Sequence, residues 1–263
     1  MAVSSVLERS FVMIQGIGLK REEQLWKNGI TDFDEFADAT ALPGISQDLT
    51  PILKERANEA KRRILLNDRE WIADALPEQE KWRMLSLVGD RSVALDVECA
   101  KINRTIAPVL VSVCRRGKGC TTLIRGEDLY WDRLAKLLHG TDILLTFNGS
   151  SFDLPLLRRC GFKLDGFIHL DLRRFSRRAG LAGGLKRIER TMGIRRPREL
   201  EYSTGSQASY LWNLWASRGS RRAIDLLIDY NRRDAESLFP LSYMIYHRLR
   251  TKRLMCIDGY ART

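Results

Sequence analysis

An apolar run that ends in two acidic residues, Asp96 and Glu98, restricts the fold more than any other feature of this chain. Residues 92–97 form an apolar, partly β-branched run, which predicts a buried β-strand. Side chains two positions apart on a strand share a face, so Asp96 and Glu98 should point the same way. Two carboxylates 4 Å apart repel by ~1 kcal/mol in water and by ~4 kcal/mol at an effective dielectric constant of 20. Protonation or a cation between them would remove the repulsion, and the cation is the simpler explanation. An isolated Asp-x-Glu, however, is more often a turn residue followed by a solvated glutamate.

A second segment repeats the plan of a strand that ends at a carboxylate. Residues 142–147 read as a buried strand, residues 148–151 have turn chemistry, and a helix with proline in its first turn begins at Asp153. Asp153 alone could simply cap this helix, which is common and stabilises a helix by ~1 kcal/mol. Asn148 and Phe152 favour a functional role, because an amide and an aromatic ring offer a hydrogen bond and a stacking face to a nucleotide.

A third segment places a tyrosine and an aspartate on one helix face. Apolar residues recur at helical spacing through residues 223–239, and Tyr230 and Asp234 are four residues apart. A phenol above a carboxylate can hydrogen-bond the water that a metal on that carboxylate polarises. Taken alone, Tyr-x-x-x-Asp is far more often a half-buried tyrosine beside a surface aspartate. The order and spacing of all three segments favour the functional interpretation.

The three segments resemble the exonuclease motifs of the DEDD superfamily, tyrosine subclass, and the second resembles the form found in proofreading domains of B-family polymerases. The sequence around them resembles the YprB-type ribonuclease H-like family from about residue 82 to about residue 245, notably at residues 168–172, 184–190, 193–195 and 226–234. The resemblance implies that Asp96 bridges two divalent ions, that Glu98 and Asp234 complete the shell of one ion, and that Asp153 holds the other. It also implies that Tyr230 orients or deprotonates the attacking water.

The ligand chemistry indicates the metal. All-oxygen ligands suit Mg²⁺ or Mn²⁺ better than zinc. The three histidines, His139, His169 and His247, are widely spaced and lie outside the motifs, which disfavours a zinc site and excludes the histidine subclass. One departure from the resemblance is Cys99, where the family more often has a threonine that contacts the terminal nucleotide.

The charge of the chain is unevenly distributed. Residues 1–80 hold 10 Lys and Arg against 15 Asp and Glu, a net charge of −5, whereas residues 81–263 hold 34 against 18, a net charge of +16. A dense basic block, interrupted only by Glu189, comprises Arg173, Arg174, Arg177, Arg178, Lys186, Arg187, Arg190, Arg195, Arg196 and Arg198. A charge run is usually a solvated face, but arginines beside a phosphodiesterase site favour polyanion binding, and we assign Arg173, Arg174, Arg177 and Arg178 to the substrate.

The acidic N-terminal region, residues 1–78, reads as a separate all-α domain. The glycines of residues 13–18 and the Leu-Pro-Gly-Ile-Ser of residues 42–46 resemble helix-hairpin-helix units, and residues 50–64 predict a long helix with an apolar stripe. Such hairpins offer backbone N–H groups to nucleic-acid phosphates. The net negative charge argues against strong binding by this region alone, so a small domain for packing or for contact with a protein partner is an equal alternative.

Composition limits the class of protein. No apolar run is long enough to span a bilayer, and Glu8 and Arg9 near the start argue against a signal peptide, so we expect a soluble cytoplasmic protein without a membrane partner. The cysteines are an odd number, five, without a Cys-x-x-Cys pair, which favours reduced thiols.

These patterns predict an α/β protein. We expect a ribonuclease H-like mixed five-stranded sheet flanked by helices in residues 79–263, with the carboxylates converging at its edge, after the small all-α domain. The predicted function is a 3′→5′ exonuclease that hydrolyses single-stranded DNA or RNA with two Mg²⁺ or Mn²⁺ ions. The alternatives are a nucleic-acid-binding protein without catalysis and an adaptor whose acidic N-terminal domain recruits a partner. No residue pattern decides between DNA and RNA.

Overall fold

The computed structural model describes residues 6–197 and 205–258, and its chain divides into two compact units. One unit comprises Met1–Leu87 together with Tyr246–Thr263, and the other comprises Val88–Ile245. The sequence placed a boundary near residue 78, whereas the compact units divide after Leu87 and the N-terminal unit also takes the end of the chain. The division into functional domains at residues 78 and 79 stays a prediction.

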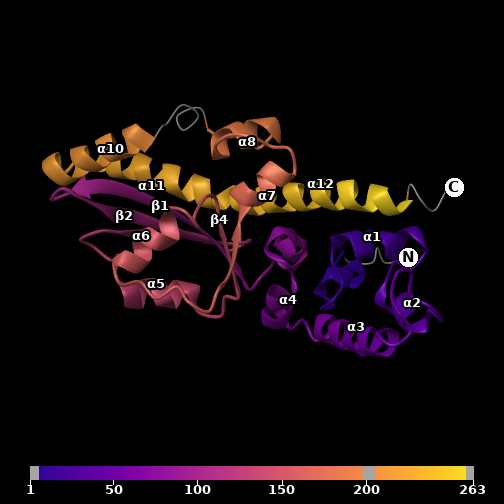
Figure 1. Cartoon of the computed structure of the whole chain (residues 1–263). Coiled ribbons are helices and arrows are strands. Elements are labelled where there is room, and N and C mark those ends of the chain that lie inside the picture. Colours follow the sequence, from indigo (N-terminus) through magenta and orange to yellow (C-terminus); the bar gives the residue numbers. More distant parts are fainter. Residues whose placement is uncertain (1–5, 198–204, 259–263) are drawn as a thin grey trace. The chain divides into compact units, whose positions relative to one another are not determined.

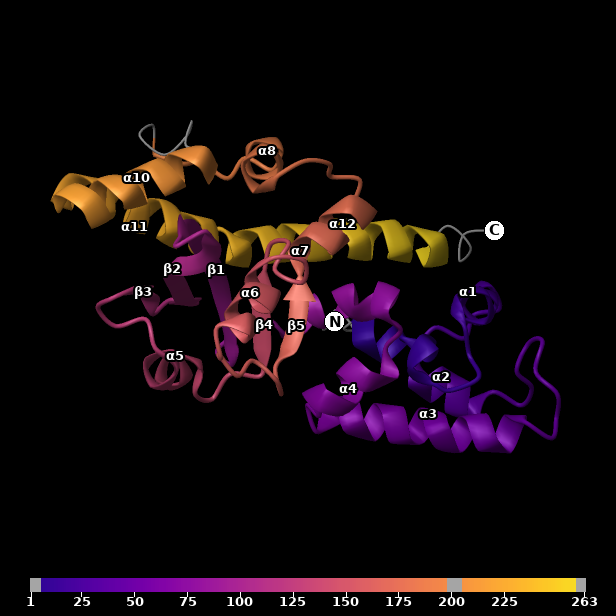
Figure 2. The same cartoon turned by 60° about the vertical axis from the view of Figure 1, so that its left-hand side comes forward.

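The larger unit is built on a mixed five-stranded sheet (Figure 2). The strands, in the order β3-β2-β1-β4-β5, run antiparallel between β1, β2 and β3 and parallel between β1, β4 and β5. Their bounds are β1 Ser92–Ile102, β2 Thr105–Arg115, β3 Gly119–Ile124, β4 Ile143–Thr146 and β5 Ile168–Asp171. The predicted α/β fold with a mixed five-stranded sheet is confirmed.

Helices cover both faces of this sheet (Figure 1). On one face, α5 and α6 pack over a core of strand residues such as Val93, Leu95 and Val97. On the other face, α10 and α11 pack over Leu110 and its neighbours. The helices are α5 Trp131–Leu138, α6 Asp153–Arg159, α7 Leu172–Arg178, α8 Leu185–Thr191, α10 Gly205–Arg218, α11 Arg221–Glu236 and α12 Leu238–Asp258. Because side chains alternate along a strand, β1 turns its apolar odd-numbered residues to α5 and α6 and its acidic even-numbered residues to α11.

In the described residues of the N-terminal unit, all the regular secondary structure is helical, as predicted. Asp32 caps α2 by accepting from the amides of Asp34 and Glu35, and Asp68 caps α4 by accepting from the amide of Trp71. The long helix predicted from residue 50 is α3, whose stripe buries Leu53, Ala57 and Ala60. The elements are η1 Val6–Arg9, η2 Phe11–Met13, α1 Leu19–Lys27, α2 Phe33–Asp38, α3 Thr50–Leu65, α4 Arg69–Ala75 and η3 Glu78–Leu87.

A buried ionic network lies within this unit. Arg83, which is completely buried, donates to both carboxylate oxygens of Glu22 at 2.9 and 2.7 Å and to Glu80 at 2.8 Å. Its guanidinium also donates to the Ser10 hydroxyl at 2.7 Å. Arg253, from the last part of α12, pairs with Glu22 at 3.0 Å. Residues of α1, η3 and α12 therefore share one set of charges, which ties both ends of the chain into the same unit.

The cysteines depart in part from the sequence-based expectation. Cys114 and Cys120 are opposite each other in the β2–β3 pairing, with Cα atoms 4.0 Å apart, and form a disulfide. Cys99 and Cys160 are free thiols, and the Cys256 side chain lies outside those described. The expectation of reduced thiols is therefore wrong for one pair, because strand register brings together two cysteines whose sequence spacing gives no such signal. In the described part of the chain, no helix is both long and apolar enough to cross a membrane.

Candidate active site

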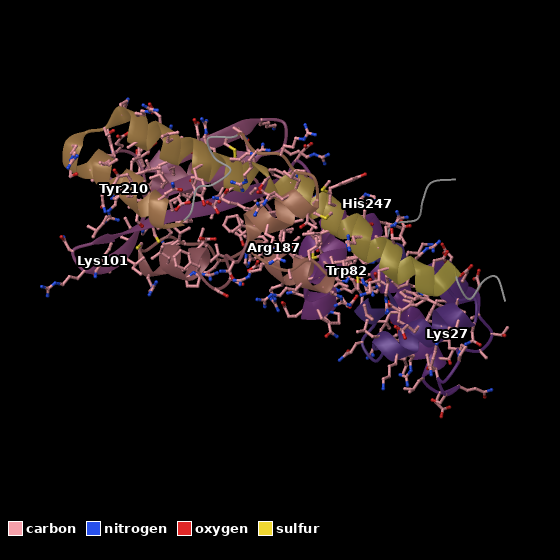
Figure 3. The ribbon with its side chains drawn as sticks, turned by 90° about the horizontal axis from the view of Figure 1, so that it is seen from above. Lys27, Trp82, Lys101, Arg187, Tyr210 and His247 are labelled. Atoms are coloured by element: carbon pink, nitrogen blue, oxygen red, sulfur yellow. A yellow bond between two sulfur atoms is a disulfide. The ribbon has the colours of Figure 1, made fainter. Side chains whose placement is uncertain are left out.

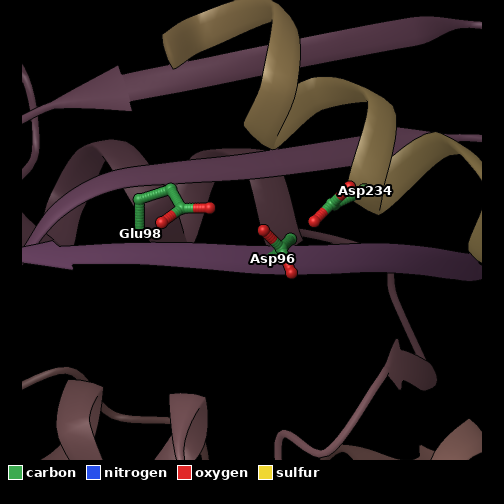
Figure 4. Close-up of side chains that lie close together, drawn as sticks. All are labelled: Asp96, Glu98 and Asp234. Atoms are coloured by element: carbon green, nitrogen blue, oxygen red, sulfur yellow. The ribbon is translucent and has the colours of Figure 1, made fainter. Parts of the chain in front are cut away.

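Three carboxylates converge between β1 and α11 (Figure 4). Asp96 and Glu98 project from the same face of β1, and Asp234 reaches them from α11. One carboxylate oxygen from each lies within 4.8 Å of the others. The strand alternation seen in the sequence thus places two of the acids, and the packing of α11 on β1 supplies the third.

Asp153 lies close to this cluster without belonging to the group within 4.8 Å. It is the first residue of α6 and is buried, with 5% of its surface exposed. Its negative charge raises the pKa of both Asp96 and Glu98. The structure therefore brings all four predicted carboxylates into one electrostatic neighbourhood.

Burial and mutual repulsion govern the protonation of these acids. Burial, followed by the charges of Asp234, Asp153 and Glu98, raises the pKa of Asp96 well above its ordinary value. Burial and the charges of Asp234 and Asp153 raise the pKa of Glu98 to about 8. Burial and the nearby Asp171 raise the pKa of Asp153 to about 7. At neutral pH these carboxyl groups tend to keep their protons unless a bound cation replaces those protons.

Two polar residues that sequence reasoning missed hold the cluster in place. Asn231, completely buried, donates from Nδ2 to Asp96 Oδ2 at 2.6 Å. Arg196 forms an ion pair with Asp234, with 2.5 Å between Nη1 and Oδ1, and also pairs with Glu189. Asn231 lies inside the third motif, three residues before Asp234. This spacing puts both side chains on the same helix face, and it could have identified Asn231 as a neighbour of the carboxylates. Nothing in the sequence distinguished Arg196 from the rest of the basic block.

The loop before Asp153 is organised by Asp171. This buried carboxylate accepts hydrogen bonds from the amides of Asn148 at 2.7 Å and Ser150 at 3.1 Å. Asn148 has a positive φ of 69°, and its Oδ1 accepts from Arg173 at 2.6 Å. A side chain at Gly149 would collide with Thr146, since a Cβ there would lie 2.3 Å from the threonine hydroxyl. Asn148 and Arg173, both predicted to bind substrate, therefore bind each other here, and Asp171 fixes the turn that leads to Asp153.

The predicted stacking residue, Phe152, lies directly before Asp153. It is 41% exposed, unlike the buried aspartate beside it. An exposed aromatic ring is able to stack on a nucleic-acid base. Its role in substrate binding stays a prediction.

Tyr230 is largely buried beside the cluster. Burial, together with the charges of Asp234, Glu98 and Asp96, raises the pKa of its phenol. The Lys186 ammonium lies 4.3 Å from the centre of the tyrosine ring. A phenol with a raised pKa keeps its proton, so it can donate a hydrogen bond to a water but is a poor base. Both roles expected from the sequence, orientation and deprotonation of the water, stay predictions.

The basic block follows α7, α8 and the segment after α8. On α7, Arg174 and Arg177 are exposed, while Arg173 and Arg178 are partly buried. Figure 3 labels Arg187, which is a residue of α8. A cavity of about 480 Å³ is lined by Lys186, Glu189, Arg190, Gly193, Ile194, Arg195 and Arg196. Arg198 lies outside the described residues.

The donor set fits divalent cations of the Mg²⁺ or Mn²⁺ type. Among the described residues, the group able to hold a metal contains carboxylates and neither histidine nor cysteine. Burial first, and neighbouring carboxylates second, raise the pKa of Glu98 and of Asp153, and a cation bound nearby would favour their ionised forms. Hard oxygen ligands in a negatively charged pocket are the preferred environment of such ions.

Comparison with known proteins identifies a superfamily for the larger unit. The family model of the RNase_H superfamily matches residues 94–246, which include every carboxylate of the site and α11. No curated protein and no solved structure matches the chain. The closer resemblance to YprB-type proteins, the tyrosine subclass and the helix-hairpin-helix units stay predictions.

Proposed function

The chain belongs to the RNase H superfamily, and from this membership and its buried carboxylates we propose that it is a metal-dependent 3′→5′ exonuclease acting on single-stranded nucleic acid. The superfamily and the acidic cluster support a nuclease that uses divalent metal. The direction of cleavage, the single-stranded substrate and a two-metal mechanism are the finer part of the proposal. They rest on the order of the three sequence motifs.

The crowding of four buried carboxyl groups with few cationic partners is the observation that carries the proposal. Asp96, Glu98, Asp153 and Asp234 all have raised pKa values, although Lys186 and Arg196 supply some positive charge. Arg196 also divides its charge with Glu189. A cluster kept for stability alone would be expected to balance its charges or to replace them by apolar groups.

The proposed ligands follow from this arrangement. Asp96, Glu98 and Asp234 would hold one ion, and Asp96 and Asp153 would hold the second. Bound divalent ions would supply an activated water and stabilise the departing 3′ oxygen of a phosphodiester. Mg²⁺ and Mn²⁺ are the ions that best suit this all-oxygen set of ligands.

Other residues of the chain would position the reactants. The protonated Tyr230 donates a hydrogen bond that orients the attacking water, and Asn231 fixes the carboxylate of Asp96. Phe152 stacks on the terminal base, and the network of Asp171 keeps the adjoining turn rigid. Exposed arginines of α7 bind the phosphates of the incoming strand.

A nuclease assay with matched variants tests this proposal. Single-stranded DNA and RNA, labelled at either end, are incubated with Mg²⁺, Mn²⁺ or EDTA. We expect stepwise release of nucleotides from the 3′ end, loss of cleavage in EDTA and a loss of at least ~10²-fold in Asp96→Asn. Asp225→Asn, which changes an exposed aspartate on α11, is the control and should cut like the wild type. Metal-dependent cleavage by Asp96→Asn at the control's rate would refute the assignment of the site.

For the acidic N-terminal region, residues 1–78, we propose contact with a protein partner. Residues 1–80 carry more acidic than basic residues, which disfavours tight contact with phosphates. Binding without catalysis, the alternative for the whole chain, would appear in the same assay as retention of the labelled strand without release of nucleotides. That outcome would favour an adaptor or a binding protein of the same fold.

A further inference from the structure

The basic cavity beside α8 adjoins the acidic cluster through two of its lining residues. Lys186 lines the cavity and also lies over the ring of Tyr230. Arg196 lines the cavity and also pairs with Asp234. The cavity wall contains four cationic side chains and one carboxylate, that of Glu189. It is therefore a positively charged space directly next to the proposed metal ligands.

Arg196 is held at the boundary between these two regions. Its side chain is 5% exposed, and its Nη2 donates to Glu189 Oε1 at 2.8 Å while Nε pairs with the other oxygen of the same carboxylate. Glu189 is itself 1% exposed, so this two-point contact anchors the guanidinium. The remaining nitrogen, Nη1, is the one that lies 2.5 Å from Asp234. Two nitrogens of the guanidinium thus bind Glu189, and the third pairs with Asp234, a proposed metal ligand.

The contact to Asp234 places Arg196 in competition with a metal ion. A carboxylate oxygen in close contact with a guanidinium is a poorer ligand for a second cation, because the two positive charges repel. The planar arginine fork suits phosphate as well as carboxylate.

We propose that the cavity is a phosphate subsite of the strand and that Arg196 exchanges between Asp234 and a phosphate bound there. Without substrate, Nη1 pairs with Asp234 and weakens metal binding. When a phosphate group enters the cavity, the planar guanidinium of Arg196 shifts as a whole. It keeps one of its two contacts with Glu189 and moves Nη1 to the phosphate, which releases Asp234 for the metal. This inference rests on the proposed nuclease function, since the ligand is the phosphate backbone of its substrate.

The exchange requires that metal and phosphate bind cooperatively. Each ligand favours the same position of Arg196, so each must increase the affinity for the other by the same factor. Couplings between two sites typically amount to about 5–150-fold. The cell would gain a nuclease whose metal site is completed chiefly when a strand is present.

Calorimetric titration of the full chain with Mn²⁺ tests the exchange without measuring cleavage. The phosphate probe is a nucleoside 5′-monophosphate, which resembles the product and cannot be cut. We expect the probe to tighten Mn²⁺ binding at least about 5-fold in the wild type. In Arg196→Met, Mn²⁺ should bind more tightly without the probe, and the probe should no longer change the affinity.

Two further variants keep the test decisive. Arg195→Met removes a cation from the same cavity wall that does not pair with Asp234, so it should weaken binding of the monophosphate but leave the Mn²⁺ affinity without the probe unchanged. If Arg196→Met fails to fold because Glu189 is left without its partner, the double variant Glu189→Gln with Arg196→Met removes both charges and takes its place. Thermal unfolding of each variant verifies the fold.

The outcomes separate this inference from the proposed function. Mn²⁺ affinity that is unchanged or weaker in the folded Arg196 variant overturns the exchange, and so does a wild type whose Mn²⁺ affinity ignores the monophosphate. If either result is found and the chain still releases nucleotides with Mn²⁺, the nuclease proposal stands. Conversely, coupling that is present in a chain that releases no nucleotides would refute the nuclease proposal and retain the subsite.

Discussion

The two units each bury a cluster of charges, and the clusters differ in balance. In the N-terminal unit, the buried carboxylates Glu22 and Glu80 contact two guanidinium groups, those of Arg83 and Arg253. In the larger unit, four carboxylates share the partial compensation of Lys186 and Arg196. Burial lowers the pKa of Arg83, but Glu22 and Glu80 more than offset that effect. The two buried carboxylates of the first cluster are matched by two guanidinium groups, of which Arg253 also pairs with the partly exposed Glu23. The four carboxylates of the second cluster are not matched in this way.

This difference indicates what each cluster is for. A buried ion pair costs desolvation energy that its partners offset only when all of them are present, so a balanced cluster contributes to a specific fold. An unbalanced cluster destabilises the chain by itself and persists where a ligand supplies the missing charge. The following predictions test that distinction.

The largest effect is expected in the balanced cluster. Arg83→Met leaves Glu22 and Glu80 buried without their main partner, and we expect it to lower the free energy of unfolding by ~3–5 kcal/mol. Chemical denaturation measures this change. The control is Arg62→Met, which removes an exposed ion pair with Glu59 on α3 and should cost at most ~1 kcal/mol. Equal effects of the two variants would mean that burial of the network does not matter.

Tyr230→Phe tests the hydroxyl in the unbalanced cluster. The ring keeps its packing and its contact with Lys186, but the hydrogen bond to the attacking water is removed. We expect the rate of the chemical step to fall by up to ~10²-fold, with little change in metal or substrate affinity. Single-turnover kinetics at saturating Mg²⁺ measures that rate, with Tyr210→Phe at an exposed position of α10 as the control. Activity within about twofold of the wild type would make Tyr230 a packing residue.

The unbalanced cluster should also make stability depend on pH in a characteristic direction. The pKa of Glu98 is raised to about 8 and that of Asp153 to about 7, so the folded chain binds protons that the unfolded chain has released. Stability from these groups is fully present below their unfolded pKa values, about 4–4.5, and is lost as the pH rises to about 8. In EDTA, we expect the free energy of unfolding to fall over this range.

Glu98→Gln should weaken this dependence of stability on pH. The amide cannot lose a proton, so at pH 8 in EDTA the variant should be more stable than the wild type, by ~1–2 kcal/mol. Added Mg²⁺ should stabilise the wild type and have a smaller effect on the variant, because a ligand is missing. Melting curves at pH 5 and pH 8, with and without Mg²⁺, measure both differences. A variant that is less stable than the wild type at pH 8 in EDTA would show that the cluster is not short of positive charge.

The smallest effect is expected from positive charge outside both clusters. Replacing the exposed Arg174 and Arg177 of α7 by glutamine should reduce the slope of log affinity against log salt by about 0.7 for each phosphate that is no longer bound. Filter binding of a single strand at several salt concentrations measures the slope. The double variant of Arg221 and Arg222, exposed at the start of α11, is the control. Equal slopes for wild type and the α7 variant would make Arg174 and Arg177 solvated surface residues.

The sequence predicted the parts of the fold and site that depend on local geometry. Alternation along residues 92–97 predicted β1 and the shared face of Asp96 and Glu98, and the four-residue spacing predicted that Tyr230 and Asp234 share a helix face. It also predicted the mixed sheet and the helical N-terminal region. Glu189, by contrast, stood out only as an interruption of the basic block, and neither Asp171 nor Asn231 received a role.

The sequence by itself therefore determined which acids could share a face, and the tertiary structure decided which partners they have. Asn231 and Asp96 are 135 residues apart, and Arg196 reaches Asp234 from the segment after α8. Such contacts depend on how α11 packs over the sheet and on where the segment after α8 lies, and no pattern within a strand or helix specifies them. The same reason applies to Cys114 and Cys120, since only the register of β2 and β3 sets them opposite each other. Local periodicity fixes the direction of a side chain, but its charge balance is a property of the space around it, which only the folded chain creates.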